Sequence, residues 1–327
     1  MKNLTIFAII LVATAAAWTY YHSKPTRIAL ISDIDHCTSR NPVSEDDLIH
    51  ITSSAKQAHA QAFISLGDNI SHRLGECTDT ANADLPFVVR SLRTFGLNTF
   101  FVLGDHDIAS KKASTNFWAK VTHTTINKGE NYYSTDIGDV HVVVLDTILG
   151  GDDLATSCTD DAHCQKLKTQ YEEKEAVNAL NPSTLQAQEE YKEYKKQISL
   201  TRSSDKRDAG RIAAAQLAWL TQDLSQTESK KILILSDHPL FAFTSERKSY
   251  DIVGREAVQK ILKQKNDKPD TKVVAISGEA HLWHHETREG IDYYILDEFK
   301  KDNAWALLSW GKEPFVQKVI NNMQEPL

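Results

Sequence analysis

RIALISD at residues 27–33 opens a pattern that decides the fold of this chain, and the pattern recurs as AFISLGD (62–68), TFFVLGDHD (99–107), ILILSDH (232–238) and VVAISGEAH (273–281). Each stretch begins with a short apolar run and ends in residues that can bind a metal. Runs rich in Ile, Val, Leu and Phe are typical of buried strands in a largely parallel sheet. Because ligand groups gather at the carboxyl ends of such strands, the five endings predict one metal site assembled from five loops.

These endings resemble the successive motifs of the calcineurin-like metallophosphoesterases, which are D-x-H, G-D, G-N-H-[DE], a lone His after a strand, and G-H-x-H. Here they stand as Asp33-Ile34-Asp35, Gly67-Asp68-Asn69, Gly104-Asp105-His106-Asp107, His238-Pro239 and Gly278-Glu279-Ala280-His281. Tyr132–Thr147 and Gln216–Leu220 also match a hairpin and a helix usual in that family. The resemblance spans about residues 26–320, with a break at 150–210, and implies an α/β fold, a two-sheet αββα sandwich.

The resemblance also implies a site with two metal ions. By position, one ion takes Asp33, Asp35, Asp68 and His281, and the other takes Asp68 as a bridge together with Asp105, His238 and Glu279. His106 is implied as the group that protonates the leaving oxygen or binds a phosphoryl oxygen, and Asp107 as the residue that orients its ring. Asn69 is a candidate phosphate contact, although the structure of its loop explains an Asn there equally well.

Three positions depart from the family pattern. Asp35 and Glu279 stand where the family has His, and Asp105 stands where it has Asn. The implied ligand set is therefore five carboxylates and two imidazoles, with a formal charge of −5. Oxygen-rich ligation favours Mn²⁺, Fe, Mg²⁺ or Ca²⁺, as divalent or mixed-valence ions, over Zn²⁺. An alternative is that the first motif is shifted by one residue, so that His36 replaces its missing His.

The function that the resemblance implies is hydrolysis of a phosphomonoester or phosphodiester by a metal-activated water. The similarity is to purple-acid-phosphatase-like and nucleotide-hydrolase-like branches, so a small organic or nucleotide-like phosphate is the expected partner. Two alternatives keep the same fold. One is a non-catalytic metal-binding or scaffold protein, which the carboxylate-rich ligand set motivates, and the other is a protein that holds calcium purely for stability.

The amino terminus predicts export. Lys2 precedes fifteen uncharged residues, Leu4–Trp18, and Ala15-Ala16-Ala17 supplies small residues of the kind found at signal-peptide cleavage sites. Residues 1–25 are therefore read as a signal peptide, or as a membrane anchor if uncleaved, and 26–327 as the phosphoesterase domain of a periplasmic or extracellular protein. The formal net charge of −7 over 327 residues gives no electrostatic case for nucleic-acid binding.

Four cysteines fit an exported protein, and the preferred pairing is Cys37–Cys77 with Cys158–Cys164. Metal-binding thiols and unrelated buried thiols are the alternatives. Residues 150–210 are rich in Glu, Lys, Gln and Ala and predict two charged helices, either a solvated excursion or a cap over the metal site. Residues 291–320 alternate apolar and polar positions and are expected to complete a second sheet.

Overall fold

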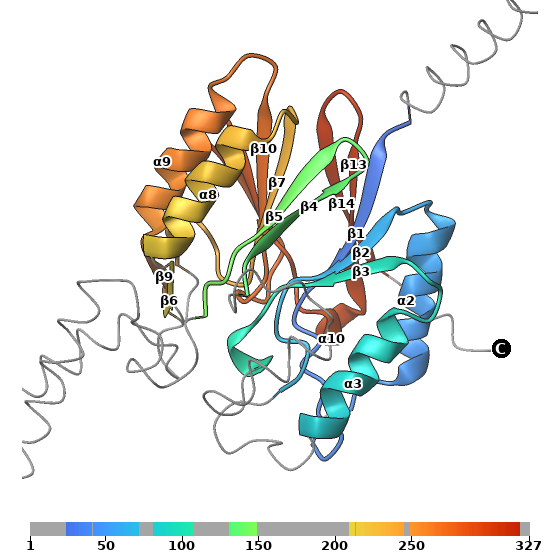
Figure 1. Cartoon of the computed structure of the whole chain (residues 1–327). Coiled ribbons are helices and arrows are strands. Elements are labelled where there is room, and N and C mark those ends of the chain that lie inside the picture. Colours follow the sequence, from blue (N-terminus) through green and yellow to red (C-terminus); the bar gives the residue numbers. More distant parts are fainter. Residues whose placement is uncertain are drawn as a thin grey trace, which may run out of the picture.

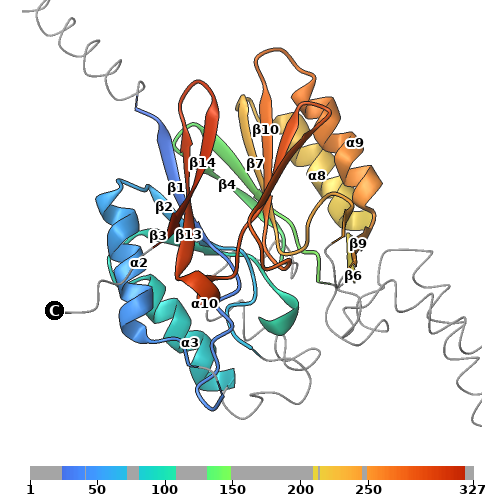
Figure 2. The same ribbon diagram turned by 180° about the vertical axis from the view of Figure 1, so that it is seen from behind.

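Two β-sheets packed face to face form the centre of the molecule, and helices cover both outer faces (Figure 1; Figure 2). The computed structural model describes residues 24–40, 42–71, 81–107, 131–148, 209–212, 214–244 and 249–320. The predicted αββα sandwich is confirmed. The predicted helices of the 150–210 insertion lie outside the described residues, as do residues 1–23.

The first sheet combines three parallel strands with an antiparallel pair. Its strand order is β14 (Pro314–Ile320), β13 (Ala304–Trp310), β1 (Thr26–Ile31), β2 (Ala62–Ser65) and β3 (Asn98–Phe101). Residues 291–320 were expected to complete the second sheet, and for β13 and β14 that expectation is wrong. β13 pairs antiparallel with β1, at the edge of β1 that faces away from β2. The alternation of apolar and polar residues along 304–320 predicts strands but does not indicate which strand edge they pair with.

The second sheet is larger and carries the remaining motif strands. Its order is β11 (His284–Arg288), β12 (Ile291–Ile295), β10 (Lys272–Ser277), β7 (Lys231–Ser236), β5 (Val140–Val144) and β4 (Tyr133–Ile137). β5, β7, β10 and β12 run parallel to one another. A small third sheet contains β6 (Ala209–Arg211), β9 (Ser249–Val253) and β8 (Phe243–Thr244).

Helices α2 (Glu45–Gln57) and α3 (Ala81–Leu92) cover the first sheet, and α8 (Ala214–Gln226) and α9 (Arg255–Asn266) cover the second (Figure 1). α2 begins where the sequence predicts, since the Ser44 side chain accepts a hydrogen bond from Asp47 N at 3.0 Å. Two short elements, the 3-10 helix η1 (Asp105–Asp107) and α10 (Phe299–Asp302), follow β3 and β12. Within the described ranges, no helix has the length and apolar character needed to cross a bilayer.

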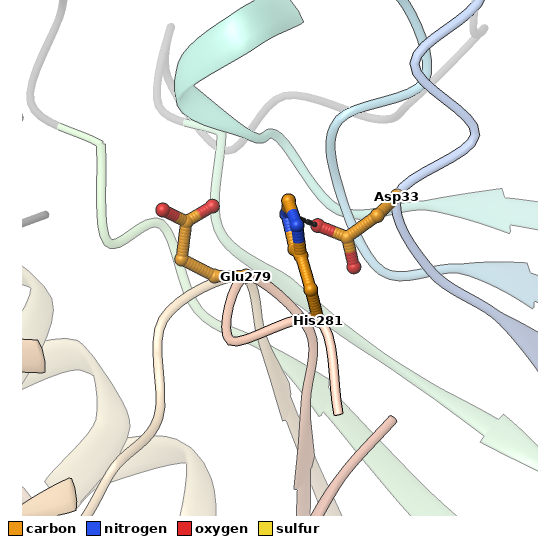
Figure 3. Close-up of side chains that lie close together, drawn as sticks. All are labelled: Asp33, Glu279 and His281. Atoms are coloured by element: carbon orange, nitrogen blue, oxygen red, sulfur yellow. Dashed lines mark ion pairs between the residues drawn. The ribbon is translucent and has the colours of Figure 1, made fainter. Parts of the chain in front are cut away.

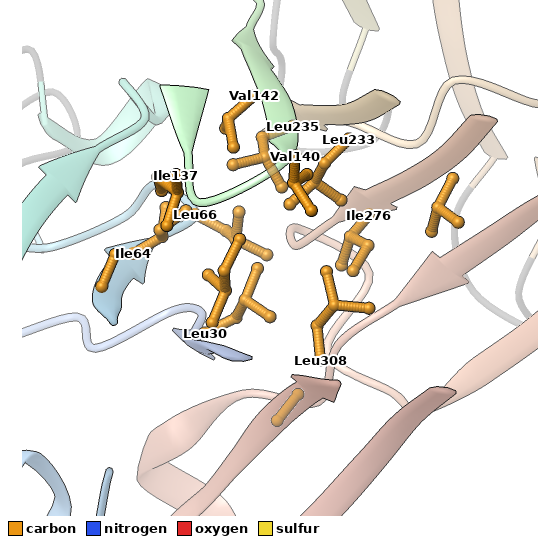
Figure 4. Close-up of a cluster of buried hydrophobic side chains, with 14 of the residues drawn as sticks. Leu30, Ile64, Leu66, Ile137, Val140, Val142, Leu233, Leu235, Ile276 and Leu308 are labelled. Carbon is orange, nitrogen blue, oxygen red and sulfur yellow. The ribbon is translucent and has the colours of Figure 1, made fainter. Parts of the chain in front are cut away.

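Both faces of the central strands are buried, which explains why their sequences are continuously apolar. In β1, Ile28 and Leu30 point into the layer between the sheets, whereas Ala29 and Ile31 point toward α2 and α3. The layer between the sheets also contains Leu233, Leu235 and other side chains shown in Figure 4. A third apolar layer lies between the second sheet and helices α8 and α9. This packing fixes the positions of the strand ends that carry the motifs.

A histidine joins the β4–β5 hairpin to helix α8. The ring nitrogens of His141 lie 2.7 Å from Asp136 Oδ1, on the neighbouring strand, and 2.9 Å from Asp223 Oδ2, on α8. Burial alone lowers the pKa of His141, but hydrogen bonds and charges of Asp223 and Asp136 raise it above its ordinary value. The imidazolium therefore stabilises the packing of the hairpin on the helix.

Substituting His141 with Gln is expected to destabilise the protein more at acidic than at alkaline pH. The folded-state pKa lies above the unfolded value of about 6.5, so the stabilisation is complete below that pH and is lost as the pH rises through the folded-state pKa. The loss should be about 1.5–3 kcal/mol near pH 6 and smaller near pH 9. Urea unfolding of both proteins with chelator present measures the difference. His50→Gln, an exposed position on α2, should change little at either pH, and an equal loss at both pH values for His141→Gln contradicts the assignment.

Candidate metal centre

The loops after β1, β2, β3, β7 and β10 lie together at the carboxyl end of the two sheets. Asp35 N donates to Asp68 O at 2.8 Å and joins the first two loops. Gly278 N donates to Asp237 O at 3.0 Å and joins the last two. Glycines allow these loops to approach closely: a Cβ on Gly104 would collide with Asp68 N in the neighbouring loop of the same sheet, and one on Gly278 would lie 3.0 Å from Asp33 Oδ2 in a loop of the other sheet.

The backbone is unusual at the residues that carry this site. Asp33, Asp35, Asp68, Glu279 and His281 have φ angles of +53°, +48°, +46°, +63° and +54°, in the left-handed region. Non-glycine residues seldom adopt this conformation, and such residues cluster at functional sites because the surrounding structure must hold them there. The turned backbone directs these side chains into one region.

A first group joins the loops after β1 and β10. Side chains of Asp33, Glu279 and His281 point toward one another (Figure 3), with one potential ligand atom of each within 4.8 Å of the others. Asp33 Oδ1 lies 3.1 Å from His281 Nε2, and Glu298 Oε2 lies 3.1 Å from His281 Nδ1. Burial lowers the pKa of His281, but hydrogen bonds and charges of Asp33 and Glu298 raise it to about 11.

A second group consists only of carboxylates: Asp68, Asp105, Asp237 and Glu279 each offer an oxygen within 4.8 Å of the others. Asp68 is 1% exposed and Glu279 is 3% exposed. Burial raises the pKa of Asp68, which the charge of His106 lowers, and repulsion from Asp237, Asp105 and Asp35 raises it further. So many buried acids at one point favour a bound cation, which would neutralise them.

A third group surrounds His106 with acids. Its Nδ1 lies 3.1 Å from Asp35 Oδ1, its Nε2 lies 3.7 Å from Asp105 Oδ1, and its backbone N donates to Asp68 Oδ1 at 2.9 Å. Burial lowers the pKa of His106, but the charge of Asp68, the hydrogen bond with Asp35 and the charges of Asp105 and Asp35 raise it to about 10. This arrangement favours the protonated ring, the form that can donate a proton or bind an anion.

Asp107 has a different role from the predicted one. Its carboxylate accepts hydrogen bonds from Asn69 N, Asn69 Nδ2 and Gly104 N at 2.8, 2.9 and 3.0 Å, so it joins the loops after β2 and β3. The carboxylate beside the His106 ring is that of Asp35. Asn69 is fully buried and its side chain donates to Asp107, which explains its presence by loop structure. Burial raises the pKa of Asp107 to about 7.

The loop after β7 places Asp237, which the motif comparison did not assign, in the carboxylate group where His238 was expected. His238 is fully buried, and its Nδ1 lies 3.1 Å from both Asp237 Oδ2 and Thr147 Oγ1. His238 is in none of the three groups, and its role as a metal ligand stays a prediction. The proposed one-residue shift to His36 is not what the structure shows, because the His36 ring stacks on Phe87 at 4.4 Å and its Nδ1 accepts from Val43 N.

The remaining predicted site residues are the cysteines. Cys37 is disulfide-bonded and buried beside the first motif. Cys77, Cys158 and Cys164 lie outside the described residues, so the pairings Cys37–Cys77 and Cys158–Cys164 stay predictions.

The donor set fits metal ions. The three groups together contain six carboxylates and two imidazoles, which are Asp33, Asp35, Asp68, Asp105, Asp237, Glu279, His106 and His281. Asp68 belongs to two of the groups and Glu279 to two, so either carboxylate could serve two adjacent ions. Carboxylate oxygens are the ligands preferred by Mg²⁺, Ca²⁺ and Mn²⁺.

Substituting Gly104 with alanine is expected to disrupt the metal centre. The added methyl group would collide with the backbone N and Oδ1 of Asp68, and would lie 3.0 Å from Asp237 Oδ1, so the carboxylate group must move apart. Metal affinity should fall by about 10- to 100-fold, the loss typical of a displaced support around a metal. Calorimetric titration with Mn²⁺ measures it. Gly311→Ala, whose nearest neighbour would be Pro25 Cβ at 3.9 Å, is the control, and equal affinities for the two variants contradict the arrangement.

Solved structures of two phosphatases have a similar fold. No protein-family model matches the sequence, and no curated protein matches it either. A dimetal phosphatase from Danio rerio has a similar structure, with a TM-score of 0.62 and 17% identity over 90% of this chain and 98% of that one. A purple acid phosphatase from yellow lupin seeds gives a TM-score of 0.51 and 10% identity, and this chain spans 53% of its length. The chain thus shares the fold of these two phosphatases, the αββα sandwich that the sequence predicts.

Proposed function

We propose that this chain, which has the fold of the metallophosphoesterases, is a metal-dependent hydrolase of phosphate esters. The observation that carries the proposal is the meeting of five strand-end loops around a carboxylate group, with His106 between Asp35 and Asp105 at its edge. Similarity of fold alone does not specify chemistry. The site adds the parts that the reaction needs, which are ligands for cations and a proton donor beside them.

The ligands divide by their positions. Asp33, Glu279 and His281 would hold one ion, and Asp68, Asp105, Asp237 and Glu279 a second. When bound, such ions acidify a water and neutralise charge on a phosphoryl group. The carboxylates favour Mn²⁺, Mg²⁺, Ca²⁺ or iron over Zn²⁺.

His106 supplies the proton. Asp35 lies 3.1 Å from Nδ1, whereas Asp105 Oδ1 is 3.7 Å from Nε2 and thus beyond hydrogen-bond distance, so Nε2 is the atom that would give its proton to the leaving oxygen. Asp107 keeps the loop that carries His106 attached to the loop of Asp68 through its bonds with Asn69. A small organic phosphate or a nucleotide-like ester is the proposed substrate class, in keeping with the motif resemblance and with the phosphatases of similar fold.

Hydrolysis of aryl phosphates tests the proposal. The chain, purified with chelator and reloaded with one metal at a time, should hydrolyse p-nitrophenyl phosphate or bis-p-nitrophenyl phosphate with Mn²⁺, Fe²⁺ or Mg²⁺ and less with Zn²⁺. Turnover of the monoester, the diester or both assigns the class of ester. Metal-loaded protein that hydrolyses neither aryl phosphate nor nucleotides contradicts the proposal.

A non-catalytic metal-binding role is the second candidate, and the charge of the site favours it. Six carboxylates exceed the charge of two divalent ions, and a negative centre repels a phosphate group. A double substitution, Asp105→Asn with Glu279→His, distinguishes the two functions because it reduces the negative charge of the site. If negative charge limits hydrolysis, the variant turns over an aryl phosphate faster with Mn²⁺ or Zn²⁺ than wild type does. A scaffold has no hydrolysis in either form.

We also propose that the protein is exported. The support is the uncharged run Leu4–Trp18 after Lys2, with small residues at Ala15–Ala17. Cell fractionation of a chain tagged at its C-terminus, with sequencing of the mature N-terminus, tests it. Recovery outside the cytoplasm with a terminus near residue 18 supports a cleaved signal peptide, recovery with membranes and an intact terminus supports an anchor, and cytoplasmic recovery contradicts export.

A further inference from the structure

Glu298 reaches the metal centre from a segment that carries no family motif. It lies between β12 and α10, 17 positions after His281 in the sequence. Its Oε2 lies 3.1 Å from His281 Nδ1, while the other ring nitrogen, Nε2, lies 3.1 Å from Asp33 Oδ1. The ring of His281 is thus held between one carboxylate within the metal centre and one outside the three ligand groups.

The segment around Glu298 is attached to the centre on both sides. Phe299 is fully buried in the core, and its backbone N donates to Ser32 O at 2.9 Å, directly before Asp33. Lys300 Nζ donates to Asp35 O at 2.9 Å. The segment that carries Glu298 is therefore attached to the loop after β1 by two contacts that do not involve His281.

His281 needs such support. Its side chain is 38% exposed, so packing alone does not fix the ring. Its backbone φ of +54° places it in a conformation that its own preferences do not favour. A carboxylate that accepts from Nδ1–H selects the tautomer whose Nε2 lone pair is available, and it makes that nitrogen a stronger donor to a metal.

We propose that Glu298 is the positioning residue of His281, which holds the ring so that Nε2 faces Asp33 and binds a metal ion there. The inference rests on the proposed metal centre and adds to it a residue outside the motifs. Asp33 and His281 belong to the same ligand group, so a rotation of the imidazole would remove one donor from that group without moving the carboxylates.

Mn²⁺ binding to the full chain tests the inference, by calorimetry and by the nitrogen couplings of bound Mn²⁺ in pulsed electron paramagnetic resonance. Glu298→Ala should weaken Mn²⁺ binding about 10- to 100-fold and reduce the imidazole coupling, as His281→Ala does. Glu298→Gln keeps an acceptor oxygen and should restore part of both. Glu286→Gln is the matched control, because Glu286 Oε2 also lies 3.7 Å from a histidine, His284, that belongs to none of the ligand groups of the described residues.

A double-mutant cycle separates positioning from simple charge. If Glu298 acts through His281, Glu298→Ala changes Mn²⁺ affinity little in a His281→Ala background. An equal loss of Mn²⁺ affinity in both backgrounds overturns the inference, since the carboxylate would then act only through its charge. An unchanged Mn²⁺ affinity in Glu298→Ala overturns it as well. Absence of Mn²⁺ binding by wild type, or an unchanged affinity in His281→Ala, overturns the proposed metal centre together with the inference.

Discussion

Asp68→Asn is expected to lose metal binding and hydrolysis together. Asp68 is buried, belongs to two ligand groups and also accepts a hydrogen bond from His106 N. Asparagine keeps the shape but removes the charge that a cation requires. The Kd for Mn²⁺ should rise by more than about 100-fold, because loss of a supporting residue around a metal already costs 10- to 100-fold. Calorimetry and an aryl phosphate assay measure the two losses.

The stability of metal-free Asp68→Asn protein distinguishes a lost ligand from a lost fold. The substitution removes a buried negative charge that is repelled by Asp237, Asp105 and Asp35. The metal-free variant should therefore have a free energy of unfolding equal to or above that of wild type. The control is Asp84→Asn, because Asp84 is also a fully buried aspartate and accepts a hydrogen bond from Thr38 Oγ1. This variant should keep metal binding. Tight Mn²⁺ binding by Asp68→Asn contradicts the ligand assignment.

His106→Ala is expected to lower the turnover number by about 10²- to 10⁴-fold, the usual contribution of a general acid, while metal content stays unchanged. Asp35, 3.1 Å from Nδ1, and the nearby carboxylate of Asp105 both favour the protonated ring, so its main role is to carry a proton and not to bind a metal. Steady-state kinetics with p-nitrophenyl phosphate and metal analysis of the same samples give the two values.

The control for His106→Ala is His285→Ala, a half-exposed histidine on β11 that stacks on Tyr294. It should leave both turnover and metal content unchanged. If His106→Ala loses metal in proportion to activity, His106 is a metal ligand and not an acid. If the variant keeps full activity, the proton comes from another group.

The fold was predictable because its strongest features are local in sequence. Apolar runs such as 232–236 and 273–277 gave the strands β7 and β10 within a residue. Gly67, Gly104 and Gly278, which the motifs contain, stand in the structure where two loops come into contact. The sheet to which β13 belongs was not predictable, since pairing with β1 depends on an edge more than 270 residues away in sequence.

The side chains of the site were less predictable, and for a physical reason. Asp237 and His238 are neighbours, and which of them turns toward the carboxylate group depends on loop dihedrals that no periodicity encodes. The same holds for Asp35, which contacts His106 through a backbone with φ of +48°. Glu298 is separated from every motif, so only the three-dimensional structure brings it to His281.

The number of metal ions bound per chain decides whether these five loops form a metal centre. Inductively coupled plasma mass spectrometry on protein purified without chelator, compared with Asp68→Asn prepared in parallel, gives that number. We expect close to two equivalents of Mn, Fe, Mg or Ca in the wild type and a clear loss in the variant. Absence of bound metal in the wild type, or the same content in both proteins, contradicts a metal centre at these five loops.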